Sequence, residues 1–382
     1  MMSCSKSIAV DIGTSTIGMA LVEETTGAIL AQCGKNNSQK KHGADVAARI
    51  RYGSTKEGAL AMKRLVQEDL IRGFFELTKE WQTIKTIVIS ANTTMEYLFL
   101  GRKTEKLGSY PFHMEDSGWR EYSFQEVFSL SNDSYEEEII EVMKQCQAKV
   151  ILLPCISTFV GGDIVSGLYH LKFLEKKSVS LLLDLGTNGE MAIVGENGFY
   201  TTSVAAGPAF EASIHGAGRK GTALLEWIAR ARCRNQMNKE GTIARRYEAT
   251  GIPLGEGLIL KQEIIRKIQL AKGALLAGIE LLLKQYGVTA QEVTEVYIGG
   301  NFGFHLDMKS AILVGMLPAN FQGKIKVVGN ASLKGAIDCI LDDNAKEEME
   351  HMIRGIQSIN LAETKEFQEL FIRRMEFAPI RL

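Results

Sequence analysis

The stretch "LLLDLGTNGEMAIV", residues 181–194, places a charged side chain where a buried strand should end. Three leucines lead into Asp184, and a glycine-containing turn separates that aspartate from a second apolar run. An aspartate at such a position is costly unless something uses its charge. Nearly the same phrase, "IAVDIGTSTIGMALV", occupies residues 8–22 and puts Asp11 in the equivalent place.

The two phrases predict an internal repeat. Asp11 and Asp184 are 173 positions apart (184 − 11), and each is followed by a hydrophobic residue, Gly-Thr and a second apolar segment. Two copies of strand, acid, glycine turn and strand indicate two similar lobes. We expect residues 1–165 to form the N-terminal lobe and residues 166–382 the C-terminal lobe, whose tail could pack back on the first.

Apolar runs typical of strands alternate with segments of helical spacing, which predicts an α/β protein. The clearest expected helices are 54–80 and 260–285, the second stopped by Gly287. A helix is also expected from Asp163 to about residue 176, and a charged helical region over 344–375. The irregular, polar segment 102–128 is expected to be an insertion or a lobe edge rather than a core element.

The amino-acid composition limits the classes of partner that the chain is expected to bind and the cellular compartment that it fits. Among 382 residues, 44 basic and 45 acidic side chains leave a net charge of −1, so neither nucleic acid nor an anionic membrane is predicted as a partner. No signal peptide and no apolar run long enough to cross a bilayer are visible. The six cysteines include no C-x-x-C pair, which fits a reducing cytoplasm and indicates neither a zinc site nor an iron–sulfur loop.

The repeated turns have the chemistry of anion sites. Glycine and hydroxyl residues expose backbone N–H groups, and glycine lets a phosphate approach the chain. The neighbouring aspartate would repel a phosphate unless a divalent cation such as magnesium lies between them. Either turn alone could equally be an ordinary hairpin, since aspartate and glycine dominate turns. A third motif, "VYIGGNFG" at 296–303, offers bare backbone to a flat ring or simply begins a helix.

These residues carry a resemblance. "DIGTSTIG", "DLGTNGE" and "YIGGNFG", in that order, resemble the phosphate-1, phosphate-2 and adenosine motifs of the actin, sugar-kinase and Hsp70 ATPase superfamily. "VGNASLKGAIDCI" is similar to the helix that closes the adenosine site, and "GGDIVSGLYHL" to the first connecting helix. The resemblance implies two actin-like (RNase H-like) lobes with Mg–ATP in the cleft between them.

A narrower family also fits. "HGADVAARI", "ANTTMEYLFLG", "AAGPAFEASIHG", "LAKGALLAG" and "GNASLKGA" resemble the ATPase portion of reductive activators of corrinoid proteins, over about residues 6–379. The resemblance implies ATP hydrolysis coupled to lobe movement, which drives reduction of cob(II)alamin to cob(I)alamin on a partner protein. In that family the electron comes from an attached iron–sulfur domain.

The present sequence starts at the first phosphate motif and has no clustered cysteines. We therefore expect no iron–sulfur cluster in this chain and a separate electron donor, such as ferredoxin or flavodoxin. A cluster shared across a homodimer interface is the alternative, and it would move the protein towards the 2-hydroxyacyl-CoA dehydratase activators.

The resemblance assigns roles to individual residues. Asp11 and Asp184 would hold magnesium, and Asp163 would orient the attacking water, so Asp163 and Asp184 are the expected catalytic acids. The remaining nucleotide contacts would be Gly13, Thr14, Ser15, Thr16, Gly186, Thr187, Asn188, Gly189, Glu211, Gly299, Gly300, Asn301, Phe302 and Asn330.

Asp163, Glu211 and Lys272 each have an ordinary structural interpretation. Asp163 could be the N-cap of its helix and Glu211 a helix-initiating acid. Lys272, in the middle of an apolar helix, is interpreted as a lysine that snorkels to solvent rather than a nucleotide contact.

Other functions stay open at this point. "HGAGRKG" at 215–221 contains a G-x-G-x-x-G but does not follow a strand, so a dinucleotide site is not favoured. There is no P-loop pattern. A small-molecule kinase of the same superfamily and a nucleotide-gated scaffold with little turnover are the alternatives to the ATP-dependent activator.

Overall fold

The computed structural model describes residues 5–128, 137–207, 222–255, 258–361 and 364–378, and its contacts divide the chain into two compact units. Unit 1 comprises residues 1–174 and 331–356, and unit 2 comprises residues 175–330 and 357–382. The chain therefore passes between the units three times. This division differs from the expected one at residue 165, because the segment 331–356 returns to the first unit.

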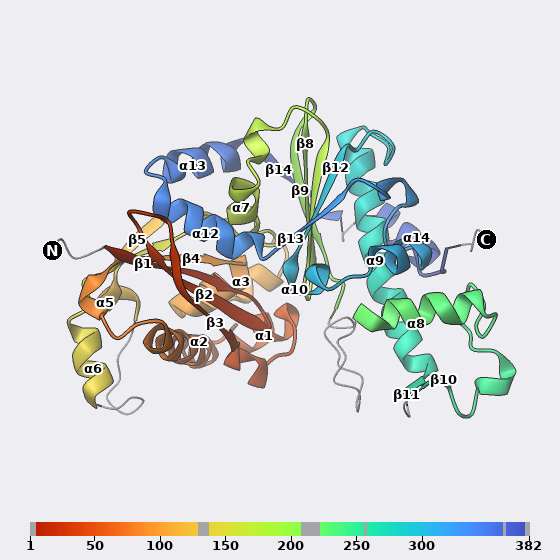
Figure 1. Ribbon diagram of the computed structural model, residues 1–382, viewed down its shortest axis with the longest axis horizontal. Helices are drawn as coiled ribbons and strands as arrows, with labels where there is room; N and C mark the ends of the chain where they lie inside the picture. The colour runs from red at the N-terminus through yellow and green to blue at the C-terminus, as the bar shows by residue number, and fades with distance from the viewer. Residues whose placement is uncertain (1–4, 129–136, 208–221, 256–257, 362–363, 379–382) are drawn as a thin grey trace. The chain divides into compact units, whose positions relative to one another are not determined.

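A six-stranded sheet forms the centre of unit 1 (Figure 1). Its strand order is β3-β2-β1-β4-β6-β5, with β1 antiparallel to β2 and parallel to β4. The strands are β1 (Lys6–Ile12), β2 (Thr16–Glu23), β3 (Ile29–Asn36), β4 (Ile84–Ala91), β5 (Arg120–Ser123) and β6 (Lys149–Leu152).

The sheet of unit 2 repeats this plan. Its order is β13-β12-β7-β8-β9-β14, and the hairpin β7–β8 followed by the parallel neighbours β12 and β13 matches β1–β2 followed by β4 and β6. The strands are β7 (Ser180–Leu185), β8 (Gly189–Gly195), β9 (Gly198–Val204), β12 (Glu295–Gly299), β13 (Ile325–Gly329) and β14 (Ile356–Ser358). The predicted repeat is confirmed.

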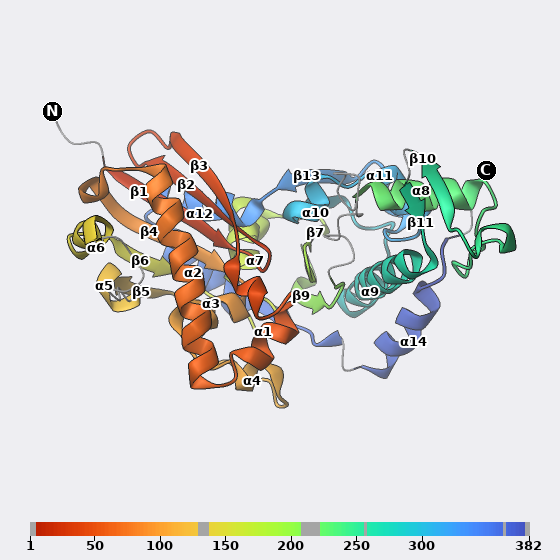
Figure 2. The same ribbon diagram turned by 90° about the horizontal axis from the view of Figure 1, so that it is seen from below.

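Side-chain alternation gives β1 two different faces. Ile8, Val10 and Ile12 belong to one buried cluster with apolar residues of α2 (Lys56–Leu77), which runs along the sheet in Figure 2. Asp11 points to the other face, where α12 (Ala331–Leu341) packs against β1 and β4. Unit 1 also contains α1 (Val46–Tyr52), α3 (Thr93–Leu100), α4 (Glu105–Gly108), α5 (Phe124–Val127), α6 (Glu137–Lys144), α7 (Gly162–His170) and α13 (Ala345–Gly355).

Helix α9 (Gln262–Tyr286) covers the corresponding face of unit 2. Its Leu275 and Ile279 share a buried cluster with Leu181 and Leu183 of β7. Helix α14 (Lys365–Arg374) packs beside α9. The other elements of unit 2 are α8 (Thr222–Cys233), α10 (Gly300–Phe304), α11 (Met308–Leu313) and the hairpin β10 (Ile252–Gly255) and β11 (Leu258–Leu260).

The two clearest helix predictions are confirmed by α2 and α9, and Gly287 ends α9 with φ +84°. One other expectation is wrong, and one is wrong in part. The region 344–375 is not one helical stretch, since strand β14 separates α13 from α14. The segment 102–128 does reach the edge of its sheet, where β5 is the last strand, but β5 pairs with β6 and Phe124 is fully buried, so the segment also contributes to the core.

Among the described residues, no helix combines the length and the apolar composition needed to cross a membrane.

The contact between α12 and α7 allows a test of the packing in unit 1. A Cβ on Gly335 would lie 1.9 Å from the backbone oxygen of Ser166, so the two helices approach too closely for any side chain there. We expect Gly335→Ala to lower the free energy of unfolding by about 1–3 kcal/mol, the usual cost of overpacking. Urea denaturation measures it.

The matched control is Gly355→Ala, which lies in the same returning segment with nothing within 4 Å of its Cβ position. Its stability should be unchanged or slightly raised, since alanine favours helix. Equal denaturation midpoints for the two variants would contradict the close packing.

Candidate functional site

The first glycine turn joins β1 to β2 and is held by side chains from outside it. The Gly13 N–H donates to the Thr16 carbonyl at 3.0 Å. Asn37 donates its side-chain amide to the Gly13 carbonyl at 2.9 Å, and the fully buried Arg49 donates to the Thr14 carbonyl. Because fixed donors hold the carbonyl oxygens, the orientation of the peptide groups in this turn is set by the surrounding structure.

Asp11 lies beside this turn and accepts a hydrogen bond from another part of unit 1. Ser332, on α12, donates to Asp11 Oδ1 at 2.8 Å. The register of the sheet places Asp11 opposite Ser90 on β4, and Ser90 Oγ lies 2.8 Å from Ser332 Oγ. The Asp11 carboxylate is therefore positioned by the hydroxyl of Ser332, a residue so distant in the sequence that the sequence alone does not reveal the contact.

Asp163 lies in the first turn of α7, but it is not the N-cap. That position belongs to Gly161, and Asp163 Oδ1 accepts from the Ile164 N–H at 2.9 Å. The cap interpretation is therefore wrong, although an acid in a first turn still suits the helix dipole. The carbonyl of Gly162, the preceding residue, lies 3.2 Å from Ser90 Oγ, so Ser90 lies against the backbone next to Asp163.

In unit 2, Asp184 lies against the two glycines of the third motif. The parallel register pairs Asp184 with Gly299. A Cβ on Gly300 would lie 2.7 Å from Asp184 Oδ1 and 2.5 Å from the Leu185 carbonyl oxygen, and Gly300 has φ +80°. Gly300 is thus required both by its backbone conformation and by the closeness of Asp184. The second and third motifs are brought together.

The other predicted residues of unit 2 lie in the turn after Asp184, directly after β13, on α10, or outside the described residues. In the turn after Asp184, the Gly186 N–H donates to the Asn188 carbonyl at 3.0 Å. Asn330 follows β13, so it lies at the same carboxyl edge of parallel strands as Asp184 and Gly299. Asn301 and Phe302 lie on α10, and Phe302 is only 6% exposed and packs in the core. Glu211 and the 215–221 glycine pattern lie outside the described residues.

Sequence reasoning missed one acid in unit 2. Glu190 on β8 is opposite Asp184 in the antiparallel register and is buried. Two carboxylates directly opposite each other repel, so this pair favours a nearby cation or donor. Glu190 belongs to the phrase "DLGTNGE". Its spacing from Asp184 across a tight turn was the signal from which the pairing of the two acids could have been predicted.

Comparison with known proteins bears directly on this arrangement. The sequence model of the RACo C-terminal domain, the ASKHA domain, matches residues 178–224 and 219–381. The model of the RACo middle region matches residues 6–176. The chain belongs to the RACo family. The predicted superfamily and the predicted two-sheet actin-like fold are thereby confirmed.

Individual RACo-like proteins are similar along almost the entire chain. The corrinoid activation enzyme RamQ of Eubacterium limosum is 26% identical over 97% of this chain and 70% of its own length. A reductase of Co(II) methylated amine-specific corrinoid protein from Methanosarcina barkeri is 21% identical, covering 97% and 76%. The solved structure of a reductive activator for corrinoid, iron–sulfur protein has a TM-score of 0.85 and 25% identity, covering 99% and 67%.

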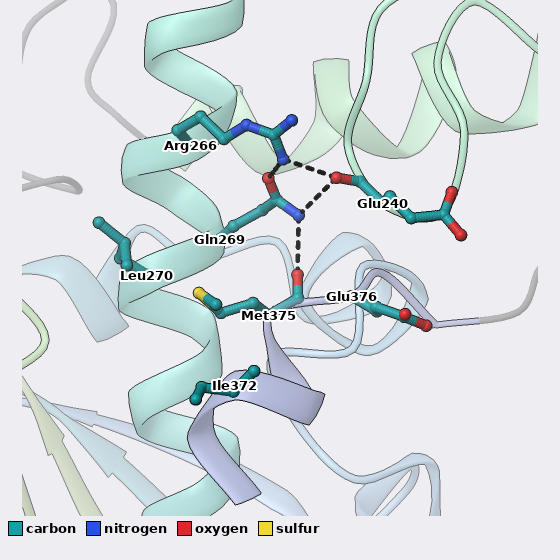
Figure 3. A pocket seen from close by; sticks show the side chains of 7 residues that line it. All are labelled: Glu240, Arg266, Gln269, Leu270, Ile372, Met375 and Glu376. Atoms are coloured by element: carbon teal, nitrogen blue, oxygen red, sulfur yellow. Dashed lines mark hydrogen bonds between the residues drawn. The ribbon is translucent and has the colours of Figure 1, made fainter. Parts of the chain in front are cut away.

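This RACo-family chain also has a pocket of about 410 Å³ that contains none of the predicted site residues (Figure 3). It lies between α9, the α14 end and the loop at Glu240. Gln269 donates to the Glu240 and Met375 carbonyls, and Arg266 donates to Gln269 and to the Glu240 carbonyl. The polar groups that line the pocket therefore join the C-terminal segment to α9.

Lys272 binds the same C-terminal segment from the interior of unit 2. Its ammonium group donates to the backbone carbonyls of Gly315, Arg374 and Glu376, and the side chain is fully buried. The snorkelling interpretation is therefore wrong. Burial lowers the pKa of Lys272 to about 7, and the nearby charge of Arg374 adds to the effect.

This pKa predicts a pH dependence of stability. Folded Lys272 loses its proton near pH 7, whereas the unfolded lysine keeps it to about pH 10.5. Between those values unfolding takes up a proton, so Lys272 makes the free energy of unfolding rise with pH. From pH 7.5 to 9.5, urea denaturation should show the free energy of unfolding of the wild-type chain rising relative to that of Lys272→Met by up to about 1.4 kcal/mol per pH unit. Parallel pH profiles for the two proteins would contradict this assignment.

Proposed function

We propose that this chain binds Mg–ATP through its two glycine turns and uses ATP hydrolysis to promote reduction of cob(II)alamin to cob(I)alamin on a corrinoid protein. The observation that carries the proposal is the repeated placement of an aspartate at the end of a central strand, beside a glycine turn, in a chain of the RACo family. The named activities of the relatives supply the reaction.

The residues at both turns fit magnesium. Asp11 and Asp184 offer carboxylate oxygens, and the turns add the hydroxyls of Thr14, Ser15 and Thr187. Magnesium accepts hard oxygen ligands and in nucleotide sites takes one or two carboxylates together with water and phosphate oxygens. When bound, the ion would neutralise charge on the phosphates.

The protein groups divide the work of binding and hydrolysis. Backbone N–H groups and hydroxyls of residues 14–16 and 187–189 bind the phosphates, because turns of this kind present donors to anions. Asp163 accepts a hydrogen bond from the attacking water and orients it towards the γ-phosphorus, since phosphoryl transfer needs positioning more than a strong base. Gly299, Gly300 and Asn330 form the edge against which the adenosine lies.

The nucleotide state would control the partner. Loss of the γ-phosphate removes the group that both turns bind, so the equilibrium between conformations of the chain changes. A coupling of roughly 1–3 kcal/mol corresponds to a 5–150-fold change in affinity for the corrinoid protein. One electron passes from a separate donor, such as ferredoxin or flavodoxin, to the cobalt. A homodimer that shares a cluster remains the alternative source of the electron.

Calorimetry tests the nucleotide site. We expect Asp184→Asn to weaken Mg–ATP binding at least 10-fold, because one carboxylate for the cation is lost, while binding of ATP in EDTA changes little. The matched control is Glu240→Gln, whose carboxylate lies at the separate pocket of Figure 3 and should leave binding unchanged. Loss of binding in the control alone would move the nucleotide to that pocket.

Turnover measurements test the partner. ATP hydrolysis should be slow with the chain alone and faster when cob(II)alamin-loaded corrinoid protein and reduced ferredoxin are present, with cob(I)alamin appearing by absorbance. The faster rate follows if the partner favours the conformation that hydrolyses ATP. Phosphorylation of a sugar or another small hydroxyl compound without any protein partner would replace this function with that of a kinase.

A further inference from the structure

Four groups from separate elements meet on the α12 face of unit 1, and all except the half-buried Asp11 are buried. Ser332 donates to Asp11 Oδ1 at 2.8 Å, and its own Oγ lies 2.8 Å from Ser90 Oγ. Ser90 Oγ lies 3.2 Å from the Gly162 carbonyl. Ser90 is fully buried and Ser332 is 5% exposed. Hydrogen bonds to a carboxylate in such surroundings are stronger than those between neutral groups.

The start of α7, which lies next to Ser90, is rigid. A Cβ on Gly161 would lie 2.4 Å from Asn92 Cα, and one on Gly162 would lie 3.0 Å from the Leu153 carbonyl oxygen. The start of α7 is therefore packed directly on neighbouring backbone. The two serine hydroxyls have two protons, which suffice for Ser90 to donate to Ser332 and for Ser332 to donate to Asp11, and Ser90 itself lies against this fixed backbone.

We propose that Ser90 and Ser332 form a hydroxyl bridge, in which Ser90 donates to Ser332 and Ser332 donates to Asp11, and that this bridge positions Asp11 for the magnesium ion. This inference rests on the proposed function and names two positioning residues that act through Asp11. Holding α12 on α7 does not require the bridge, because the Gly335 contact and the Ser166 hydroxyl, which donates to the Ser332 carbonyl at 2.7 Å, already join the two helices.

The test compares three buried serines. Ser332→Ala and Ser90→Ala should each raise the Mn²⁺ concentration that half-saturates the ATP-bound protein, measured by electron paramagnetic resonance, by roughly 10-fold, the usual effect of losing a partner of a metal ligand. ATP binding in EDTA should be unchanged. Ser166→Ala is the control, since its hydroxyl bonds to the same helix but does not reach Asp11. Ser332→Thr keeps the hydroxyl and should restore most of the Mn²⁺ affinity.

The outcomes separate this inference from the function on which it rests. A wild-type chain that binds no Mg–ATP or Mn–ATP overturns the proposed function and the bridge with it. A wild-type chain that binds, with Ser332→Ala and Ser90→Ala matching Ser166→Ala in Mn²⁺ affinity, overturns the bridge alone. If Ser332→Ala does not fold, Ser90→Ala and Ser332→Thr decide the question.

Discussion

A carboxylate at the end of a central strand must be accommodated on the face of the sheet that does not pack against the long helix. In both units the strand alternates so that its leucines or isoleucines face a long helix, while the aspartate faces the opposite way. The neighbour across the parallel register is Ser90 in one sheet and Gly299 in the other. Both are small, so each carboxylate has room beside the next strand.

The two copies of this arrangement have diverged in how they hold the charge. Asp11 accepts from a hydroxyl that a returning helix supplies, so its position depends on tertiary contacts. Asp184 is instead enclosed by glycine backbone and lies opposite Glu190. In the first copy a serine hydroxyl lowers the electrostatic cost of the carboxylate, whereas in the second a neighbouring acid raises that cost.

Much of the fold could be predicted from the sequence because the relevant signals are local. The repeat, α2, α9 and the ends of β1 and β7 follow from periodicity and from acids placed beside glycine. The residues around the acids could not be found this way. Ser332 meets Asp11 across 321 positions, and the partners of Lys272 lie up to 104 positions away. β5 was missed because its sequence is polar and it lies at a sheet edge, where side chains need not be apolar.

The return of residues 331–356 to unit 1 has a consequence during protein synthesis. When residue 174 has been made, the sheet of unit 1 has α2 on one face, but α12 does not yet exist. The next 182 residues (356 − 174) take roughly 10–40 s at ordinary translation rates. During that interval the face of β1 and β4 that α12 later covers presents Val88 together with Ala9, Asp11 and Ser90. The small and polar neighbours keep the apolar patch around Val88 narrow, which limits the tendency of this unfinished surface to aggregate on the ribosome while unit 2 is being translated.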